Sequence, residues 1–182
     1  MKTDRIILGI DPGTTIMGYG LIHIINTKMQ LIKMGVIHLS KLNSHEVRLK
    51  KIFERTLSLI DQYKPDEFAV EAPFYGKNVQ SMLKLGRAQG VAMSSALYRE
   101  IPIFEYAPKK IKQSITGNGN ASKEQVASML KSLLNITEMP QHLDASDGLA
   151  AAVCHAFQRT NISEKKYSNW SSFIKNNPKK IK

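Results

Sequence analysis

Apolar residues along the chain follow two patterns, the short runs typical of strands and the three-to-four-residue spacing typical of helices. The order of these segments predicts a mixed α/β fold. The polar pair Asn26 and Thr27 predicts a turn between two strands, so the first three strands are expected to form consecutive antiparallel hairpins. The two later strands each follow a helical segment and are expected to enter the sheet by crossover connections. Runs rich in β-branched residues and bounded by turn-forming residues predict strands over 5–11, 17–25, 29–40, 67–71 and 103–106.

Helical spacing of apolar residues predicts the elements between and after these strands. Ser122, with Gln125 three residues later, resembles a capping box at the start of a helix. The predicted five-stranded mixed sheet flanked by helices resembles the ribonuclease-H-like architecture. Helices are expected between the candidate N-caps Asn43 or Ser44 and Pro65, over 78–100, from Pro108 to about Gly117, over 122–134 and over 143–159.

Length and composition favour one domain with a lysine-rich tail. A chain of 182 residues, 42% of them hydrophobic, can bury a core without disulfides or a structural metal. Residues 160–182 contain few large apolar side chains and no clear periodicity. We therefore predict one ribonuclease-H-like domain over 1–159 and a basic, disordered tail over 160–182.

The cysteine count and the N-terminus bear on the compartment. The chain has a single cysteine, Cys154, which fits a reducing environment and is expected to be a small core side chain. The first apolar stretch stops at Asp11, so neither a signal sequence nor a membrane span is expected. These features predict a cytoplasmic protein that does not enter a membrane.

Four carboxylates stand where predicted strands end or a helix begins. Asp11 ends one apolar run and Glu71 another, while Asp144 and Asp147 are spaced to share one helix face. Clustered carboxylates repel one another, and hard divalent cations relieve that repulsion. Each acid alone is also consistent with an N-cap or a surface charge, and sequence separation does not establish contact.

The net charge changes the interpretation of these acids. The formal charge is +11, so an acidic cluster would be embedded in a strongly basic molecule. This combination suits a polyanionic substrate that is held by lysines and cut by metal ions.

Several motifs, taken together and in order, resemble the RuvC family of Holliday-junction resolvases. The resemblance extends over about residues 5–157. The motifs are Gly9-Ile10-Asp11-Pro12-Gly13-Thr14-Thr15, Gly18-Tyr19-Gly20, Glu71 followed by Phe74, Leu83-Lys84-Leu85-Gly86 and Asp144-Ala145-Ser146-Asp147-Gly148-Leu149-Ala150.

The resemblance implies an activity, a cofactor and partners. It implies a homodimer that nicks two strands of a four-way DNA junction symmetrically, with Mg²⁺ or Mn²⁺, and leaves 5′-phosphate ends. A two-ion site and a branch-migration helicase partner are further implications. The four acids, Asp11, Glu71, Asp144 and Asp147, fall on the family's acidic active-site positions, so metal binding and catalysis are carried over to each of them.

Gly148 departs from the family motif, and the neighbouring His142 is not included among the predicted catalytic residues. Gly148 stands where the family motif has alanine, and a glycine inside a helix is expected to weaken it by about 1 kcal/mol. His142 precedes the acidic pair and is interpreted as a loop residue rather than a ligand.

Three further residues are candidates for DNA contact. Phe74 follows Glu71 in a loop containing proline and glycine, where stacking on an unpaired base competes with packing under the loop. Lys112 and Lys123 flank a glycine-asparagine segment and fall on basic positions of the family, so phosphate contact competes with a solvated helix face.

The 78–100 segment carries a stripe that permits two interpretations. The residues that recur there at helical spacing are Val79, Met82, Leu83, Gly86, Gly90, Met93 and Leu97. Packing on the sheet is the simpler interpretation, whereas the resemblance implies a two-fold dimer contact near residues 86–93.

Three rival functions remain at the level of sequence. The turn after Asp11 also resembles the first phosphate loop of actin-like ATPases, but the chain has room for one lobe and shows no second loop. A non-catalytic DNA-binding module would not need all four acids. Another nuclease of the same architecture, acting on RNA–DNA hybrids or other branched DNA, would share the acids without the junction-specific loop and dimer.

Overall fold

The computed structural model describes residues 4–73, 78–138 and 143–163. Its five strands form one mixed sheet in the order β3-β2-β1-β4-β5. Strands β1, β2 and β3 pair antiparallel, β4 is parallel to β1, and β5 is parallel to β4. The strands are β1 (Asp4–Asp11), β2 (Ile16–Ile25), β3 (Lys28–His38), β4 (Glu67–Glu71) and β5 (Ile103–Tyr106). The predicted five-stranded mixed sheet is confirmed.

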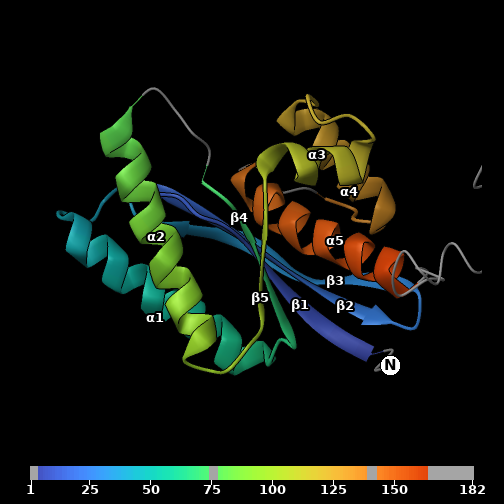
Figure 1. Cartoon of the computed structure of the whole chain (residues 1–182), viewed down its shortest axis with the longest axis horizontal. Helices are drawn as coiled ribbons and strands as arrows, with labels where there is room; N and C mark the ends of the chain where they lie inside the picture. The colour runs from blue at the N-terminus through green and yellow to red at the C-terminus, as the bar shows by residue number, and fades with distance from the viewer. Residues whose placement is uncertain (1–3, 74–77, 139–142, 164–182) are drawn as a thin grey trace, which may run out of the picture.

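Helices cover both faces of this sheet. Helices α1 (His45–Tyr63) and α2 (Val79–Leu97) lie on one side, and α3 (Pro108–Thr116), α4 (Lys123–Leu133) and α5 (Asp144–Ser163) lie on the other (Figure 1). Successive residues of β1 therefore both meet a core: Ile7 faces the α3–α5 side and Leu8 the α1–α2 side, and both are fully buried. This explains why the central strands read as continuous apolar runs rather than alternating ones.

Helices α1 and α4 begin at capping residues that the sequence predicts. The Ser44 hydroxyl accepts from the backbone N–H of Val47 at 3.3 Å, which selects it over Asn43 as the N-cap of α1. The capping box of α4 is present: the Gln125 N–H donates to Ser122 Oγ at 3.2 Å, and the Ser122 N–H donates to Gln125 Oε1 at 2.9 Å.

Helix α5 differs from the prediction at its end. It extends to Ser163, so the predicted boundary after residue 159 is wrong for residues 160–163. Residues 160–163 include neither proline nor glycine, so nothing local stops the helix at 159. The rest of the predicted tail lies outside the described residues.

Glycines allow α5 to approach the sheet closely. A Cβ added at Gly148 would lie 2.5 Å from Tyr19 Cα, and one added at Gly20 would lie 2.4 Å from Leu149 Cα. Gly148 is therefore required by packing, because the close approach of α5 to β2 leaves no room for a side chain. The sequence had suggested only a weakened helix at this position.

Among the described residues, no helix has the length and apolar character needed to cross a bilayer.

Candidate active site

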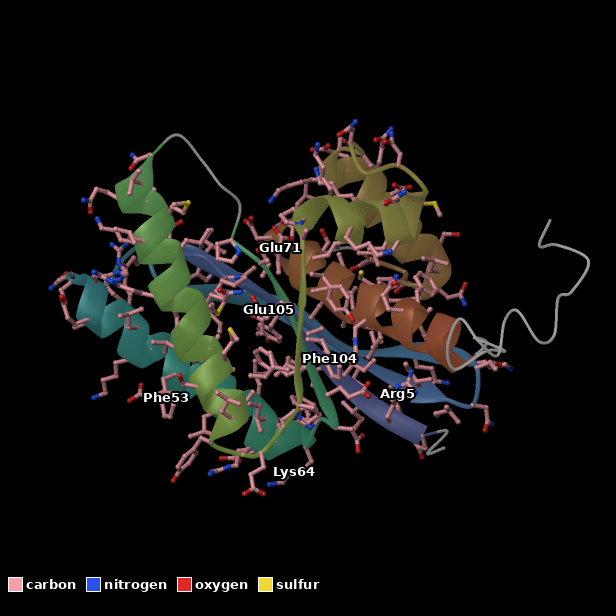
Figure 2. The ribbon with its side chains drawn as sticks, viewed as in Figure 1. Arg5, Phe53, Lys64, Glu71, Phe104 and Glu105 are labelled. Carbon is pink, nitrogen blue, oxygen red and sulfur yellow. The ribbon has the colours of Figure 1, made fainter. Side chains whose placement is uncertain are left out.

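Two neighbouring strands bring two of the four acids to one end of the sheet. Asp11 is the last residue of β1, and Glu71 is the last residue of β4. These strands are parallel, and their register pairs Ile10 with Val70, so the two acids follow side by side. Figure 2 shows Glu71 at the end of the sheet opposite Arg5.

The start of α5 brings the other two acids to the same place. Asp144 and Asp147 lie in the first turn of this helix. A Cβ added at Gly18 would lie 1.9 Å from the carbonyl oxygen of Asp144, and Gly18 pairs with Asp11 across the β1–β2 ladder. The helix start is therefore seated directly on the strand beside Asp11.

Burial and mutual repulsion raise the pKa values of three of these acids. The pKa of Asp11 is raised well above its ordinary value by burial and then by the charges of Glu71, Asp147 and Asp144. Burial, followed by the charge of Asp147, raises the pKa of Glu71 to about 7. Burial also raises the pKa of Asp147. All four acids thus belong to one electrostatic cluster.

Lys123 provides a positive charge inside this cluster. Its Nζ donates to Asp147 Oδ2 and lies 3.4 Å from Asp144 Oδ1. Burial would lower the pKa of Lys123, but the hydrogen bond and charge of Asp147, together with Asp144, raise it overall. The sequence assigned Lys123 to phosphate contact, and the structure shows that its ammonium group also binds two of the acids.

Lys112 lies near the same cluster. Its charge lowers the pKa values of Glu71 and Asp147, although burial outweighs this effect for both acids. Helix α3 carries Lys112 and helix α4 carries Lys123. Two basic side chains from separate helices therefore share the rim of the acidic site.

The donor chemistry of the cluster suits a hard divalent cation. In the part of the chain that the structure describes, no group of three or more His, Cys, Asp or Glu side chains is arranged to hold a metal ion as it stands. Two of the acids instead direct oxygens at Lys123. Carboxylate oxygens are the ligands that Mg²⁺ and Mn²⁺ prefer. The pKa of Asp11 is raised by burial first and by the neighbouring carboxylates second, and a cation would relieve the repulsion between those carboxylates. The residues therefore fit the metal in charge and donor type.

Two residues singled out in the sequence cannot be placed. Phe74 and His142 both lie outside the described residues.

One buried polar residue next to the site, Gln89, was not predicted from the sequence. Gln89 of α2 is 7% exposed, and its Nε2 donates to the carbonyl oxygen of Glu71 at 3.3 Å. A glutamine within a helical pattern carries no local signal of such a contact, because its partner is 18 residues away in sequence.

The stripe on α2 faces outward in the single chain. Val79, Leu83 and Leu97 are 58%, 49% and 62% exposed, while Ala88, Ala92 and Ala96 face the core with no exposed surface. A Cβ added at Gly86 or Gly90 would meet nothing within 4 Å. Packing on the sheet, the simpler interpretation of the sequence, is therefore wrong for Val79, Leu83 and Leu97. Met93 of the same stripe does pack against the core.

Comparison with known proteins gives consistent matches over nearly the whole chain. The chain is 66% identical to the crossover junction endodeoxyribonuclease RuvC of Christiangramia forsetii, over 100% of this chain and 95% of that protein. It is 59% identical to the protein of the same description from Bacteroides fragilis, over 98% of this chain and 97% of that protein.

Solved structures agree with the sequence matches. The structure of Thermus thermophilus RuvC in complex with a Holliday junction substrate is 31% identical, with a TM-score of 0.81, over 87% of this chain and 97% of that chain. The yeast mitochondrial resolvase Ydc2 is 14% identical with a TM-score of 0.64, which shows a shared fold.

A RuvC-like nuclease fold implies the use of a divalent metal, in agreement with the donor chemistry above. The family model described as crossover junction endodeoxyribonuclease RuvC matches residues 7–155, which include all four acids, Lys112 and Lys123. With this match and the high identity of full-length relatives, the chain belongs to the RuvC family of crossover junction endodeoxyribonucleases.

Proposed function

We propose that this chain is a structure-selective endodeoxyribonuclease that resolves four-way DNA junctions in recombination and repair. The observation that carries the proposal is the convergence of Asp11, Glu71, Asp144 and Asp147 at one end of the sheet in a molecule of charge +11. Membership of the RuvC family supports the junction as substrate, since a Thermus thermophilus member has been captured with one. The reaction is phosphodiester hydrolysis that leaves 5′-phosphate and 3′-hydroxyl ends.

The four acids hold the metal in this proposal. Asp11 and Glu71 bind and orient it from the strand ends, and Asp144 and Asp147 complete its ligands from α5. When bound, Mg²⁺, replaceable by Mn²⁺ and present as two ions, supplies a Lewis acid that lowers the pKa of water and neutralises charge at the phosphate. Asp11 and Glu71 must be ionised to act as ligands, although burial favours their neutral forms.

Basic and aromatic residues position the DNA. Lys112 and Lys123 stand at the rim of the acid cluster, where a scissile phosphate would come between ammonium groups and carboxylates. Lys123 can exchange its carboxylate partners for phosphate oxygens, which are the same kind of acceptor. We assign Phe74 to stacking on an unpaired base, on the strength of its sequence position after Glu71.

The substrate and the open α2 surface both favour a homodimer. A four-way junction with two-fold symmetry offers two equivalent phosphodiesters, which two identical active sites can cut in pairs. The outward stripe of Val79, Leu83 and Leu97, with open space at Gly86 and Gly90, is the contact surface we assign. The proposal includes a branch-migration helicase as a further partner and places the reaction in the cytoplasm.

A cleavage assay on a defined substrate tests the function. A synthetic four-way junction and a matched linear duplex are incubated with Mg²⁺ or with EDTA, beside the Asp11→Asn variant. Paired, Mg²⁺-dependent nicks in the junction, sealed by ligase and absent from the variant, are expected. Equal cutting of the duplex, or of an RNA–DNA hybrid, would identify another nuclease of this architecture, and tight binding without cleavage would identify a binding module.

A further inference from the structure

The amide of Gln89 is buried on the inner face of α2, where its neighbours along the helix are apolar. Ala88 and Ala92 have no exposed surface, and Gln89 is 7% exposed. A buried amide costs free energy unless its hydrogen bonds are made. The role of Gln89 therefore depends on the groups to which it is bonded.

Both of its partners are acceptors at the carboxyl ends of strands. Gln89 Nε2 donates to the main-chain carbonyl of Glu71 at 3.3 Å and to Glu105 Oε2 at 3.0 Å. Glu71 and Glu105 come from the neighbouring strands β4 and β5 (Figure 2). One side chain of α2 thus holds the main chain of a proposed metal ligand.

The sheet itself cannot supply this hydrogen bond, because of a proline. The backbone N–H of Phe68 donates to Pro102, just before β5, and that of Ala72 donates to Tyr106 of β5. In a regular strand the carbonyl of Glu71, on the alternate residue, would then point toward β1. In a parallel ladder whose last pair is Ile10 and Val70, the next donor to that carbonyl would be the N–H of residue 12. Residue 12 is Pro12, which has no N–H. Gln89 Nε2, which lies 3.3 Å from the carbonyl oxygen of Glu71, can serve as a donor in its place.

We propose that Gln89 is a positioning residue that fixes the main chain of Glu71 from α2, and so sets where the Glu71 carboxylate meets Asp11. This inference rests on the proposed function, in which Glu71 binds metal. Pro12 and Gln89 form a complementary pair, in which one ends the ladder beside Asp11 and the other restores the lost bond. Helix α2 carries the proposed dimer contact on its outer face, and its inner face holds β4, the strand that ends at Glu71.

The test begins with Gln89→Met, which keeps the length of the side chain and removes the donor. Cleavage of a saturating four-way junction at saturating Mg²⁺ is expected to fall about tenfold, since small misplacements of catalytic groups are costly. The junction Kd is expected to stay unchanged. Binding of Mn²⁺ to the DNA-free protein, measured by electron paramagnetic resonance, is expected to weaken about threefold to tenfold.

Ser95→Ala is the matched control on the same helix. Ser95 is fully buried and its hydroxyl bonds to the carbonyls of Phe53 and Val91, away from Glu71. This variant is expected to lose stability without a change in Mn²⁺ affinity or in the cleavage rate at saturation. Equal losses of metal affinity in Ser95→Ala and Gln89→Met would show a structural effect and overturn the inference.

Pro12→Ala supplies a rescue that depends on the hydrogen bond. The new N–H at position 12 can complete the ladder, so the penalty of Gln89→Met is expected to shrink from about tenfold to less than about threefold in the Pro12→Ala background. The same penalty in both backgrounds, or unchanged Mn²⁺ affinity in Gln89→Met, would overturn the inference. Absence of junction cleavage by the unmodified protein would overturn the proposed function instead, and the Mn²⁺ measurements would still decide the role of Gln89.

Discussion

Individual acids in the site are held at a cost in stability. Asp11 and Glu71 are buried close to like charges, which disfavours their ionised forms. Lys123 offsets part of this repulsion through Asp144 and Asp147. The metal-free protein is therefore expected to gain stability when the acids are neutralised, by protons, by substitution or by a cation.

The pH dependence of stability follows from Glu71. Its pKa is about 7 in the folded protein against 4.5 in the unfolded chain, so its contribution is fully present below pH 4.5 and is lost as the pH rises through about 7. Glu71→Gln removes this loss. The stabilisation of the variant relative to the unmodified protein, both metal-free, is therefore expected to be larger at pH 8.5 than at pH 4.5 by up to about 3 kcal/mol. Denaturant unfolding in EDTA at both pH values measures the difference. A pH-independent difference between the two proteins would contradict the assignment.

Asp11→Asn separates catalysis from binding. The substitution removes one proposed ligand but no positive charge, so cleavage is expected to fall more than about a hundredfold while junction affinity is kept. Gel-shift titration in Ca²⁺ and single-turnover cleavage in Mg²⁺ measure the two properties. Loss of both together, with a lowered unfolding temperature, would indicate misfolding rather than loss of chemistry.

Close approach between elements is what assembles the acids. Helix α5 is seated on β1 and β2 through glycines, so the acidic first turn of α5 lies beside the end of β1. Farther along the same helix, the fully buried His155 bonds to Glu67 of β4 at 3.0 Å and to Tyr106 of β5 at 2.6 Å. Both kinds of contact hold α5 against the strands that carry Asp11 and Glu71.

Gly18→Ala tests the seating of α5. The added Cβ would lie 1.9 Å from the carbonyl oxygen of Asp144, so α5 or β2 must move. Unfolding free energy is expected to fall by about 1–3 kcal/mol, and cleavage to fall with it at temperatures where the variant is folded. Gly90→Ala, where a Cβ meets nothing within 4 Å, is the control and is expected to retain or gain stability, because alanine favours a helix interior over glycine. Equal stability of Gly18→Ala and the unmodified protein would contradict the packing argument.

At the scale of the whole molecule, charge and an open apolar surface point to larger assemblies. A molecule of charge +11 is attracted to nucleic acid from a distance, and its salt dependence reports the phosphates that it contacts. The outward face of α2 leaves three large apolar side chains exposed in the single chain. The proposed complex therefore joins two copies of the chain and one junction.

Leu83→Glu is expected to produce a monomer. Leu83 lies in the middle of the outward stripe and is 49% exposed, so a charge there would be buried in the dimer. Sedimentation velocity at about 10 µM measures the oligomeric state, and paired nicking is expected to become single nicking. Val47→Glu on α1, at a position with 47% exposure, is the matched control. If the unmodified protein is already monomeric, the assignment of the outward face of α2 to a dimer contact is wrong.

Lys112→Ala is expected to weaken junction binding in a salt-sensitive way. Removal of one phosphate contact should reduce the slope of log affinity against log salt by about one. Fluorescence anisotropy on a labelled junction over a salt series gives the slope. An unchanged slope together with reduced turnover would place Lys112 in the chemistry of the acids, near which it lies, rather than in DNA binding.

Local patterns in the sequence determined the elements and the kind of chemistry. Strand boundaries agree with the predictions to within about two residues, and Ser44 and the Ser122–Gln125 box begin α1 and α4 as expected. These features depend on hydrogen bonds and side-chain spacing within a few residues, so a single sequence contains them. The positions of the four acids at element ends were predictable for the same reason.

Tertiary structure alone decided which surfaces those elements present to one another. Apolar spacing shows that a helix has an apolar stripe but not what covers it, so spacing alone could not decide between packing of the α2 stripe on the sheet and its exposure. The ion pairs of Lys123, the steric need for Gly148 and the contact of Gln89 with Glu71 each join residues distant in sequence. Such contacts depend on how whole elements pack, and the local sequence around a residue does not identify its distant partner.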